Sequence, residues 1–292
     1  MNRKRRYYPG DHWVYYKIYA GEKGIEQLVK DLLLPVVRKM EREKLISRWF
    51  FLRYADPEFH LRVRFYTPDR KDQYAVMEYI YQSISKRKYT DLIYKVQIDT
   101  YEQEIERYGA ETIDLSESLF SVDSHAIANL ISGLQGEEDR EVVRWQLALL
   151  LIDGMLEAFQ LDIVQKSDCM SSIALAYKEE FQMINQPYSG QLNEKYRIYR
   201  KVIEQVMKEQ GENELLMKYK KILSQRFTNF LKLAPLFKER VTTIRLNELL
   251  WSFMHMSMNR LFINKNRIHE LVVYDFLDRY YKSEIAKRKY MG

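Results

Sequence analysis

The sequence predicts an α+β fold in which an N-terminal ferredoxin-like antiparallel sheet is followed by a largely helical C-terminal part. In the first 120 residues, strand-like segments alternate with helical ones, and beyond about residue 123 the strand signals mostly vanish. Gly and Pro number only 10 and 6 of 292 residues, while 46% of the residues are hydrophobic. This composition is typical of a folded, helix-rich protein with a sizeable core, and it excludes a disordered chain.

The N-terminal portion, residues 1–120, contains four strand-like and two helix-like segments. Aromatic and β-branched side chains predict strands at residues 13–19, 48–54, 59–66 and 94–99. Apolar side chains at helical spacing predict helices at 22–43, with a kink at Pro35, and at 69–85. The turn-forming residues 55–58 favour a hairpin between the second and third strands. The order β-α-β-β-α-β fits a ferredoxin-like sheet.

The C-terminal portion, residues 121–292, reads as a series of helices. Apolar spacing predicts them at residues 124–133, 138–160, 167–184, 193–209, 212–233, 245–262 and 268–285. Glycine-containing segments at 133–136, 188–190 and 211 are the expected connectors. Because no Pro/Gly/Ser-rich linker marks a boundary near residue 120, we expect a single α+β domain over 1–292.

Charge, cysteine content and motifs exclude several classes of protein. The net charge is +6, and the basic run Arg3 to Arg6 is typical of a solvated tail rather than a nucleic-acid motif. One cysteine, Cys169, excludes an intramolecular disulfide. No signal peptide and no apolar run of about 18 residues occur, so a cytoplasmic protein without membrane spans is expected. Metal-ligand spacings and phosphate-binding glycine motifs are absent, so no metal and no cofactor is expected.

The predicted third strand carries two arginines on one face. In His60-Leu61-Arg62-Val63-Arg64-Phe65, alternation directs the three apolar side chains to the core and His60, Arg62 and Arg64 together to the other face. Charged residues on a strand usually mark a solvated surface. Two neighbouring guanidiniums also suit a bound carboxylate, which the planar fork of arginine clamps through paired hydrogen bonds.

Two further segments carry polar side chains at helical spacing. Glu104 and Arg107 are three residues apart, with Gly109 as the end of the turn; such a pair is most often a surface ion pair. In the predicted helix 245–262, His255 shares a face with Ser252 and Asn259, among large apolar residues. A histidine there is either a satisfied core residue or a neutral general base.

Taken in order, these motifs resemble those of the thiopeptide-type bacteriocin biosynthesis family. The resemblance extends from about residue 12 to 262 and includes the standalone glutamate-elimination domain of class I lanthipeptide and thiopeptide dehydratases. The segments that carry it are Trp13-Val14-Tyr15-Tyr16-Lys17-Ile18-Tyr19, Arg53-Tyr54-Ala55-Asp56-Pro57, His60-Leu61-Arg62-Val63-Arg64, Glu104-Ile105-Glu106-Arg107-Tyr108-Gly109, Phe120-Ser121-Val122-Asp123-Ser124, His255-Met256 and Asn259-Arg260-Leu261.

The resemblance implies a cofactor-free lyase that acts on a ribosomally made precursor peptide. Such a domain eliminates glutamate from glutamylated Ser/Thr to leave dehydroalanine or dehydrobutyrine. The chain has no portion long enough for glutamylation, so the resemblance implies a separate tRNA-dependent glutamylating enzyme as a partner. A second copy of this chain is a further candidate partner.

The family's elimination residues match five positions of this sequence. The resemblance implies His255 as the group that transfers the proton, Arg64 and Arg107 as fixed positive charges for the developing anions, and Arg62 and Glu104 as substrate-binding residues. Two alternatives stay open. One is a pyridine synthase that performs a formal [4+2] cycloaddition with release of the leader peptide, and the other is a non-catalytic scaffold that binds the leader.

Overall fold

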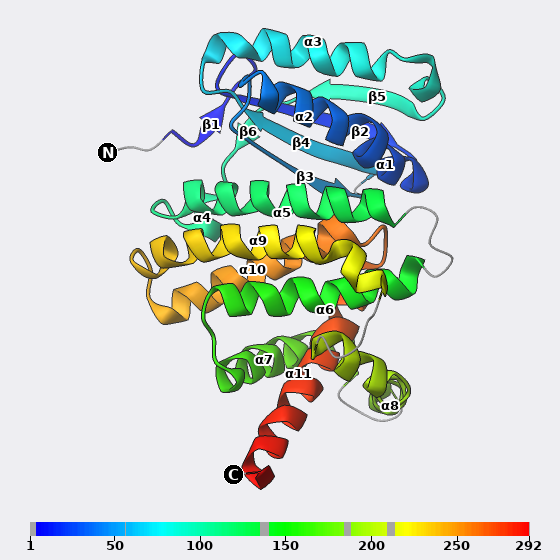
Figure 1. Ribbon diagram of the computed structural model, residues 1–292. Helices are drawn as coiled ribbons and strands as arrows, with labels where there is room; N and C mark the ends of the chain where they lie inside the picture. The colour runs from blue at the N-terminus through cyan, green and yellow to red at the C-terminus, as the bar shows by residue number, and fades with distance from the viewer. Residues whose placement is uncertain (1–3, 56, 135–139, 184–187, 209–213, 292) are drawn as a thin grey trace. The chain divides into compact units, whose positions relative to one another are not determined.

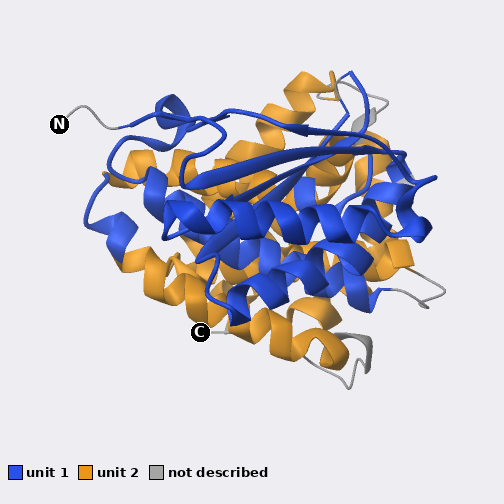
Figure 2. Cartoon of the chain, turned by 90° about the horizontal axis from the view of Figure 1, so that it is seen from above, with its two compact units in different colours: residues 1–135, 236–241, 259–264 blue, residues 136–235, 242–258, 265–292 orange. Residues whose placement is uncertain are grey.

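The computed structural model describes residues 4–55, 57–134, 140–183, 188–208 and 214–291. The chain folds into two compact units (Figure 2). The first unit comprises Met1–Gln135, Leu236–Val241 and Asn259–Asn264, and the second Gly136–Pro235, Thr242–Met258 and Lys265–Gly292. A single domain over residues 1–292 stays a prediction.

A four-stranded antiparallel sheet forms the centre of the first unit, in the order β3-β4-β2-β5 (Figure 1). Helices α1 and α2 follow β2, and α3 follows β4, so the chain runs β-α-β-β-α-β and the predicted ferredoxin-like sheet is confirmed. The bounds are β2 Trp13–Ala20, α1 Glu22–Leu28, α2 Leu34–Arg42, β3 Arg48–Tyr54, β4 His60–Tyr66, α3 Gln73–Ile84 and β5 Ile93–Ile98.

Short elements complete this part of the chain. A π-helical turn, Val29–Leu33, ends two residues before Pro35, which has no backbone N–H to donate, so an irregular turn lies close to the predicted kink. The short strand β1, Arg6–Tyr7, pairs with β6, Tyr101–Glu102. The side chain of Arg6 is exposed, as expected for a solvated run, and pairs with Glu102, but its backbone belongs to a strand and not to a tail. Short 3-10 turns occupy Arg70–Asp72 and Arg87–Tyr89.

The apolar face of β4 forms the core as predicted. Leu61, Val63 and Phe65 are fully buried, and the antiparallel register places them beside Ile18, Tyr16 and Val14 of β2. Helices α1 and α3 contact β2. Burial of each such large apolar side chain contributes about 1.5–3 kcal/mol.

The edge of the sheet at β3 is covered by helix α5, Ile113–Gly133. Alternate backbone N–H groups of this edge strand point away from the sheet, and side chains accept them: Trp49 N–H donates to Ser121 Oγ and Phe51 N–H to Ser124 Oγ, both at 3.2 Å. Asn259 completes the series, because its Oδ1 accepts from Arg53 N–H and its Nδ2 donates to Arg53 O, each at 2.9 Å. The polar side chains of two family motifs thus satisfy buried backbone groups.

Helix α5 starts at Ile113, so the predicted start at residue 124 is wrong. Its first half buries polar side chains, among them Ser116, Glu117 and Ser121, and these interrupt the apolar periodicity on which the prediction relied. The Glu117 carboxylate accepts from Tyr101 Oη at 2.8 Å and from Gln103 Nε2 at 2.7 Å. These bonds attach the segment before α4, Ile105–Tyr108, to helix α5.

A buried ion pair joins α5 to the end of α10, Thr243–Leu261, within the first unit. Arg260 Nη1 lies 2.9 Å from Asp123 Oδ2, and both side chains are fully buried. Arg260 Nε donates to Ser124 Oγ at 3.0 Å, and the Arg53 Nε donates to the Arg260 carbonyl at 3.0 Å. Loss of either charged partner would leave the other charge buried without compensation.

Helices alone make up the described part of the second unit, and they confirm the predicted helical C-terminal part. Helix α7 starts earlier than predicted, because Asp162 and Gln165 form a capping box. Residues 188–190, expected as a connector, lie inside α8, so that prediction is wrong. The bounds, including ends that belong to the first unit, are α6 Arg140–Ala158, α7 Ile163–Glu180, α8 Tyr188–Met207, α9 Glu214–Lys238, α10 Thr243–Leu261 and α11 Asn266–Met291.

We expect Asp123→Asn to lower the free energy of unfolding by about 3–5 kcal/mol, because it leaves the Arg260 charge buried without its carboxylate. Urea unfolding followed by circular dichroism measures the change. Asp114→Asn is the matched control, since Asp114 is exposed on the same helix and its loss should cost less than about 1 kcal/mol. Equal effects of the two substitutions would contradict a stabilising role for the buried pair.

The pH dependence of stability should report on Glu117. Burial raises the pKa of this carboxyl above its usual value of 4.5, against the opposing effect of its hydrogen-bond donors. Its protonated form therefore stabilises the fold below pH 4.5, and this contribution is lost as pH rises through the folded-state pKa. Relative to wild type, Glu117→Gln should become more stable between pH 4 and 7 in urea unfolding. Glu239→Gln, at an exposed position, should show no such trend.

Candidate active site

The polar face of β4 is covered rather than solvated. Register pairs place Tyr15 beside Arg64 and Lys17 beside Arg62. Arg64 is 7% exposed and His60 is 1% exposed, whereas Arg62 is half-buried. The expectation of a typical solvated strand face therefore does not hold for two of its three polar residues.

Arg64 sits in a cage of aromatic rings. Its guanidinium carbon lies 4.3 Å from the centre of the Tyr15 ring, 4.9 Å from Tyr101 and 5.2 Å from Phe50. Ring faces attract a cation but accept no strong hydrogen bond. Among the residues that the structure describes, the buried Nε and Nη1 atoms of Arg64 have no hydrogen-bond partner. The cage therefore holds a positive charge with two donor atoms, Nε and Nη1, that have no hydrogen-bond partner among the described residues.

The positive charge of Arg64 affects the pKa of the neighbouring Tyr15. Burial raises the pKa of Tyr15, while the positive charges of Arg64, Arg62 and Lys17 act in the opposite direction. Of the charged groups that influence the pKa of Tyr15 here, Asp99 is the one acidic group, and it forms an ion pair with Lys17. This face of the sheet thus carries more positive than negative charge.

Arg62 is fixed by two contacts on the same face. Its guanidinium stacks 3.4 Å from the centre of the Tyr54 ring, and its Nε donates to His60 Nε2 at 3.0 Å. The second ring nitrogen of His60, Nδ1, lies 2.8 Å from the Glu58 carbonyl. Because that carbonyl can only accept, His60 carries its proton on Nδ1 and accepts from Arg62 on Nε2. The histidine thus orients Arg62.

Glu104 and Arg107 lie at the start and within the single turn α4, Ile105–Tyr108. Arg107 Nη1 is 3.8 Å from Glu104 Oε2, and both side chains are well exposed. Gly109 ends the turn with φ of 78°, as predicted, a conformation that glycine adopts without strain. Burial raises the pKa of Tyr101, on which Glu117, Arg64 and Glu104 also act. The Tyr101 hydroxyl is therefore an electrostatic neighbour of both Arg64 and Glu104.

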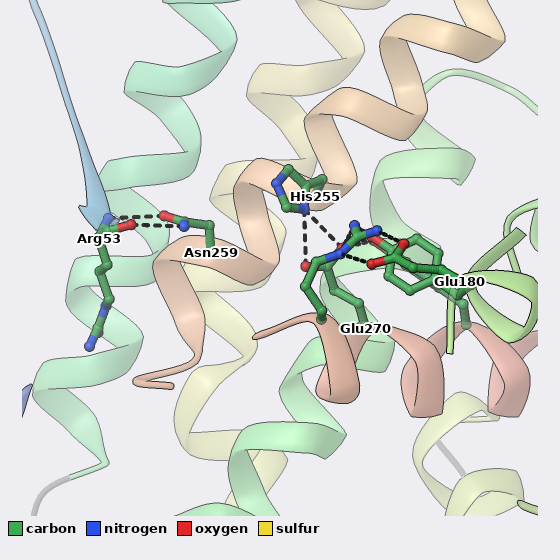
Figure 3. A network of polar contacts seen from close by, with 8 residues as sticks. Arg53, Glu180, His255, Asn259 and Glu270 are labelled. Carbon is green, nitrogen blue, oxygen red and sulfur yellow. Dashed lines mark hydrogen bonds and ion pairs between the residues drawn. The ribbon is translucent and has the colours of Figure 1, made fainter. Parts of the chain in front are cut away.

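In the second unit, His255 on α10 contacts a buried carboxylate on α11 (Figure 3). His255 Nδ1 lies 3.0 Å from Glu270 Oε1 and 2.9 Å from Oε2. The His255 side chain is 25% exposed, whereas that of Glu270 is 0% exposed. His255 therefore has a buried acidic partner and a partly exposed ring.

Tyrosines complete the surroundings of Glu270. Tyr177 donates to Glu270 Oε2, and the Tyr274 hydroxyl lies 3.4 Å from the same oxygen. Burial, followed by the charge of Glu270, raises the pKa of both phenols. Both tyrosines consequently keep their protons and serve as donors to the carboxylate.

Four of the five predicted site residues lie in the first unit: Arg62, Arg64, Glu104 and Arg107. His255 belongs to the second unit. Sequence reasoning missed the partners of these residues. The contact of Tyr15 with Arg64 could have been predicted, since Tyr15 and Lys17 are two residues apart and share a face of the strand that pairs with β4. No sequence signal distinguishes Glu270 from the surface acids of its helix.

Metal-ligating clusters and membrane-spanning helices do not occur in the described part of the chain. Its residues contain no group of three or more His, Cys, Asp or Glu side chains placed to hold a metal ion. No helix among them is long and apolar enough to cross a membrane. Cys169 is half-buried and forms no disulfide, and burial raises the pKa of its thiol to about 11.

Curated proteins similar to this chain take part in lantibiotic biosynthesis. The nisin biosynthesis protein NisB of Lactococcus lactis subsp. lactis is 33% identical over 131 residues, 44% of this chain and 13% of NisB. The subtilin biosynthesis protein SpaB of Bacillus subtilis is 24% identical over 183 residues, 62% of this chain and 18% of SpaB. The chain thus spans less than a fifth of these relatives.

Solved structures share the fold. The tRNA-dependent lantibiotic dehydratase MibB from Microbispora sp. 107891 superposes with a TM-score of 0.71 at 20% identity, over 96% of this chain and 29% of MibB. The pyridine synthase TbtD from thiomuracin biosynthesis gives 0.62 at 12% identity, over 93% of this chain and 99% of TbtD. Identities this low establish the fold alone.

A family model decides the assignment. The model of the lantibiotic biosynthesis dehydratase C-terminal family matches residues 13–281, which include all five predicted site residues. The resemblance predicted from the motifs is confirmed: this chain belongs to the lantibiotic biosynthesis dehydratase C-terminal family.

Proposed function

We propose that this chain eliminates glutamate from glutamylated Ser/Thr of a ribosomal precursor peptide and leaves dehydroalanine or dehydrobutyrine. The observation that carries the proposal is Arg64, a buried guanidinium in an aromatic cage, whose Nε and Nη1 have no partner among the described residues. A buried charge without a counter-ion is costly, and a bound carboxylate would supply one. Glutamylated peptides carry that group on the glutamyl side chain and release another on elimination.

The charges around Arg64 suit the remaining parts of a glutamyl ester. In the proposal, Arg62 binds substrate carboxylate together with Arg64, since both project from the same face of β4. The Glu104 carboxylate accepts hydrogen bonds from the glutamyl ammonium group. Arg107, which pairs with Glu104 in the structure, stabilises the negative charge that develops during elimination.

The elimination itself needs one proton transfer. His255 takes the α-proton of the esterified residue, the electrons of that C–H bond form the Cα–Cβ double bond, and the Cβ–O bond breaks. Glutamate leaves as a carboxylate with the electron pair of that bond, and the proton passes on from the imidazolium. His255 is suited to this role because its ring is partly exposed while its Nδ1 is held by Glu270.

The substrate requires a preceding glutamylation. In the proposal a separate tRNA-dependent enzyme esterifies the precursor peptide, and this chain acts on the product. A second copy of the chain as a partner stays a prediction.

A pyridine synthase is the second candidate, because the likeness to TbtD covers 99% of that chain. In that case the substrate would be a peptide with two dehydroalanines, and the products a ring-closed core and a free leader. The two activities differ in mass change, so one assay separates them. Purified protein is incubated either with glutamylated precursor peptide or with the peptide that carries two dehydroalanines, and the products are analysed by mass spectrometry. Elimination predicts loss of glutamic acid from the glutamylated peptide and no change in the dehydroalanine peptide. The opposite result would contradict the proposal. A leader-binding scaffold would bind either peptide and change neither.

Arg64→Lys should reduce kcat for glutamate loss about 10²–10³-fold, because lysine cannot present the planar fork of donors to a carboxylate. Release of glutamate from glutamylated peptide, followed by mass spectrometry, measures the effect. Arg70→Lys is the matched control, since Arg70 is exposed on a 3-10 turn, and it should leave the rate unchanged. If Arg64→Lys retains the wild-type rate, Arg64 is not the anion-binding residue.

His255→Asn should reduce the rate about 10²–10⁴-fold while the glutamylated peptide still binds, because the substitution removes proton transfer and leaves the arginines intact. Single-turnover mass spectrometry gives the rate, and isothermal titration calorimetry gives the Kd. A loss of binding with an unchanged single-turnover rate would argue against His255 as the proton-transfer group.

A further inference from the structure

The buried carboxylate of Glu270 is surrounded by groups that can only donate to it. Tyr177 donates to Oε2, and the Tyr274 hydroxyl lies 3.4 Å from the same atom. Arg267 Nη1 is 3.9 Å from Oε2. Glu270 itself is completely buried, so water does not compensate its charge. The direction of each hydrogen bond around Glu270 therefore shows which atom carries the proton.

The chain of donors has a fixed direction. Arg267 Nη1 donates to the Tyr177 hydroxyl, and arginine has no acceptor. Tyr177 has one hydroxyl proton, and with Arg267 as the donor to its oxygen, this proton goes to Glu270. The outer end is held by the Arg267–Glu180 ion pair, which is about half-exposed on both sides. The polarity therefore runs from Arg267 through Tyr177 to Glu270.

The same logic applies to the other end of the network. His255 Nδ1 lies within 3.0 Å of both Glu270 oxygens, and a carboxylate has no proton to donate. Nδ1 must therefore be the protonated ring nitrogen. Among the described residues, no hydrogen-bond partner of Nε2 occurs, so this nitrogen is the one available to a ligand.

We propose that Glu270 is a positioning residue that holds His255 in the Nδ1–H tautomer and presents the bare Nε2 for proton transfer. The tautomer follows from the geometry alone, and its consequence for catalysis rests on the proposed function. Nε2 takes the α-proton of the esterified residue, and the resulting imidazolium is stabilised by the adjacent carboxylate. An Nε2–H ring would have its proton where the base lone pair is required. Comparable carboxylate–histidine pairs fix the tautomer in serine proteases.

The tautomer can be tested without substrate. With histidines labelled at both ring nitrogens, long-range ¹H–¹⁵N correlation spectra distinguish Nδ1–H from Nε2–H, and His255→Asn assigns the His255 signals. In the wild type, at a pH where the ring is neutral, we expect the Nδ1–H pattern. An Nε2–H pattern in the wild type would overturn the proposal whatever the variants do.

Glu270→Gln should reverse the tautomer. Its carbonyl oxygen is retained at the Oε2 position by the Tyr177 proton, which leaves the amide NH₂ facing His255 Nδ1. A donor in that place requires a bare Nδ1 and hence Nε2–H. Glu180→Gln is the matched control at the outer end of the network and should retain the wild-type tautomer. An unchanged tautomer in folded Glu270→Gln would contradict the proposal.

Activity separates a positioning role from a purely structural one. On glutamylated peptide, Glu270→Gln should lower kcat about 10²-fold or more with little change in KM, and Glu270→Asp should restore part of the rate. Glu180→Gln should retain the wild-type rate. A wild-type rate in Glu270→Gln with a reversed tautomer would sink the catalytic role of Glu270. If wild-type protein shows Nδ1–H but never releases glutamate, the proposed function fails while the tautomer assignment stands.

Discussion

The outer edge of β3 imposes the constraint on which the first unit depends. Its outward N–H groups are buried and must find acceptors, and Ser121, Ser124 and Asn259 supply them. Two residues of strand advance about 6.6 Å, whereas three residues of helix advance about 4.5 Å, so one helix cannot follow a strand edge indefinitely. Helix α5 therefore serves two N–H groups, and the end of α10 serves the third. This geometry gives a physical reason for the serine and asparagine positions in two family motifs.

Two of the buried arginines in this unit, Arg260 and Arg64, differ in how their charge is compensated. Arg260 pairs with Asp123 at 2.9 Å, so its charge is compensated and its role is explained by stability. Arg64 has the faces of three aromatic rings instead, and each cation–π contact of a desolvated pair contributes about 2 kcal/mol or more. Ring faces do not replace a carboxylate, however, because they leave Nε and Nη1 of Arg64 without a hydrogen-bond partner among the described residues. Arg260 has a buried carboxylate as its partner whereas Arg64 has none among the described residues, and this difference argues that Arg64 serves a ligand.

The sequence predicted the sheet well because its strands are rich in aromatic and β-branched residues, and because the segment between β3 and β4 contains Asp and Pro. Local patterns were sufficient there, down to the Leu61 and Arg62 faces of β4. Prediction failed where tertiary contacts overrode local pattern, as at the start of α5, whose buried face carries Glu117. The site followed the same division. Motifs identified the arginines and His255, but the acceptor of the His255 proton is a buried glutamate that looks like any other helix residue until the fold buries it.

Burial alone does not mark a functional group in this protein. Asp123 and Glu117 are as buried as Glu270. Asp123 pairs with the Arg260 guanidinium, and Glu117 accepts hydrogen bonds from Tyr101 and Gln103, but these three donors are themselves buried. Glu270 differs because one of its donors is an imidazole with a second nitrogen at a partly exposed position. A carboxylate that binds one nitrogen of an imidazole also determines whether the other nitrogen carries a proton. Histidine does so through its two nitrogens, since fixing one determines the state of the other. This property, rather than burial or charge, distinguishes the His255–Glu270 pair from the structural pairs of the fold.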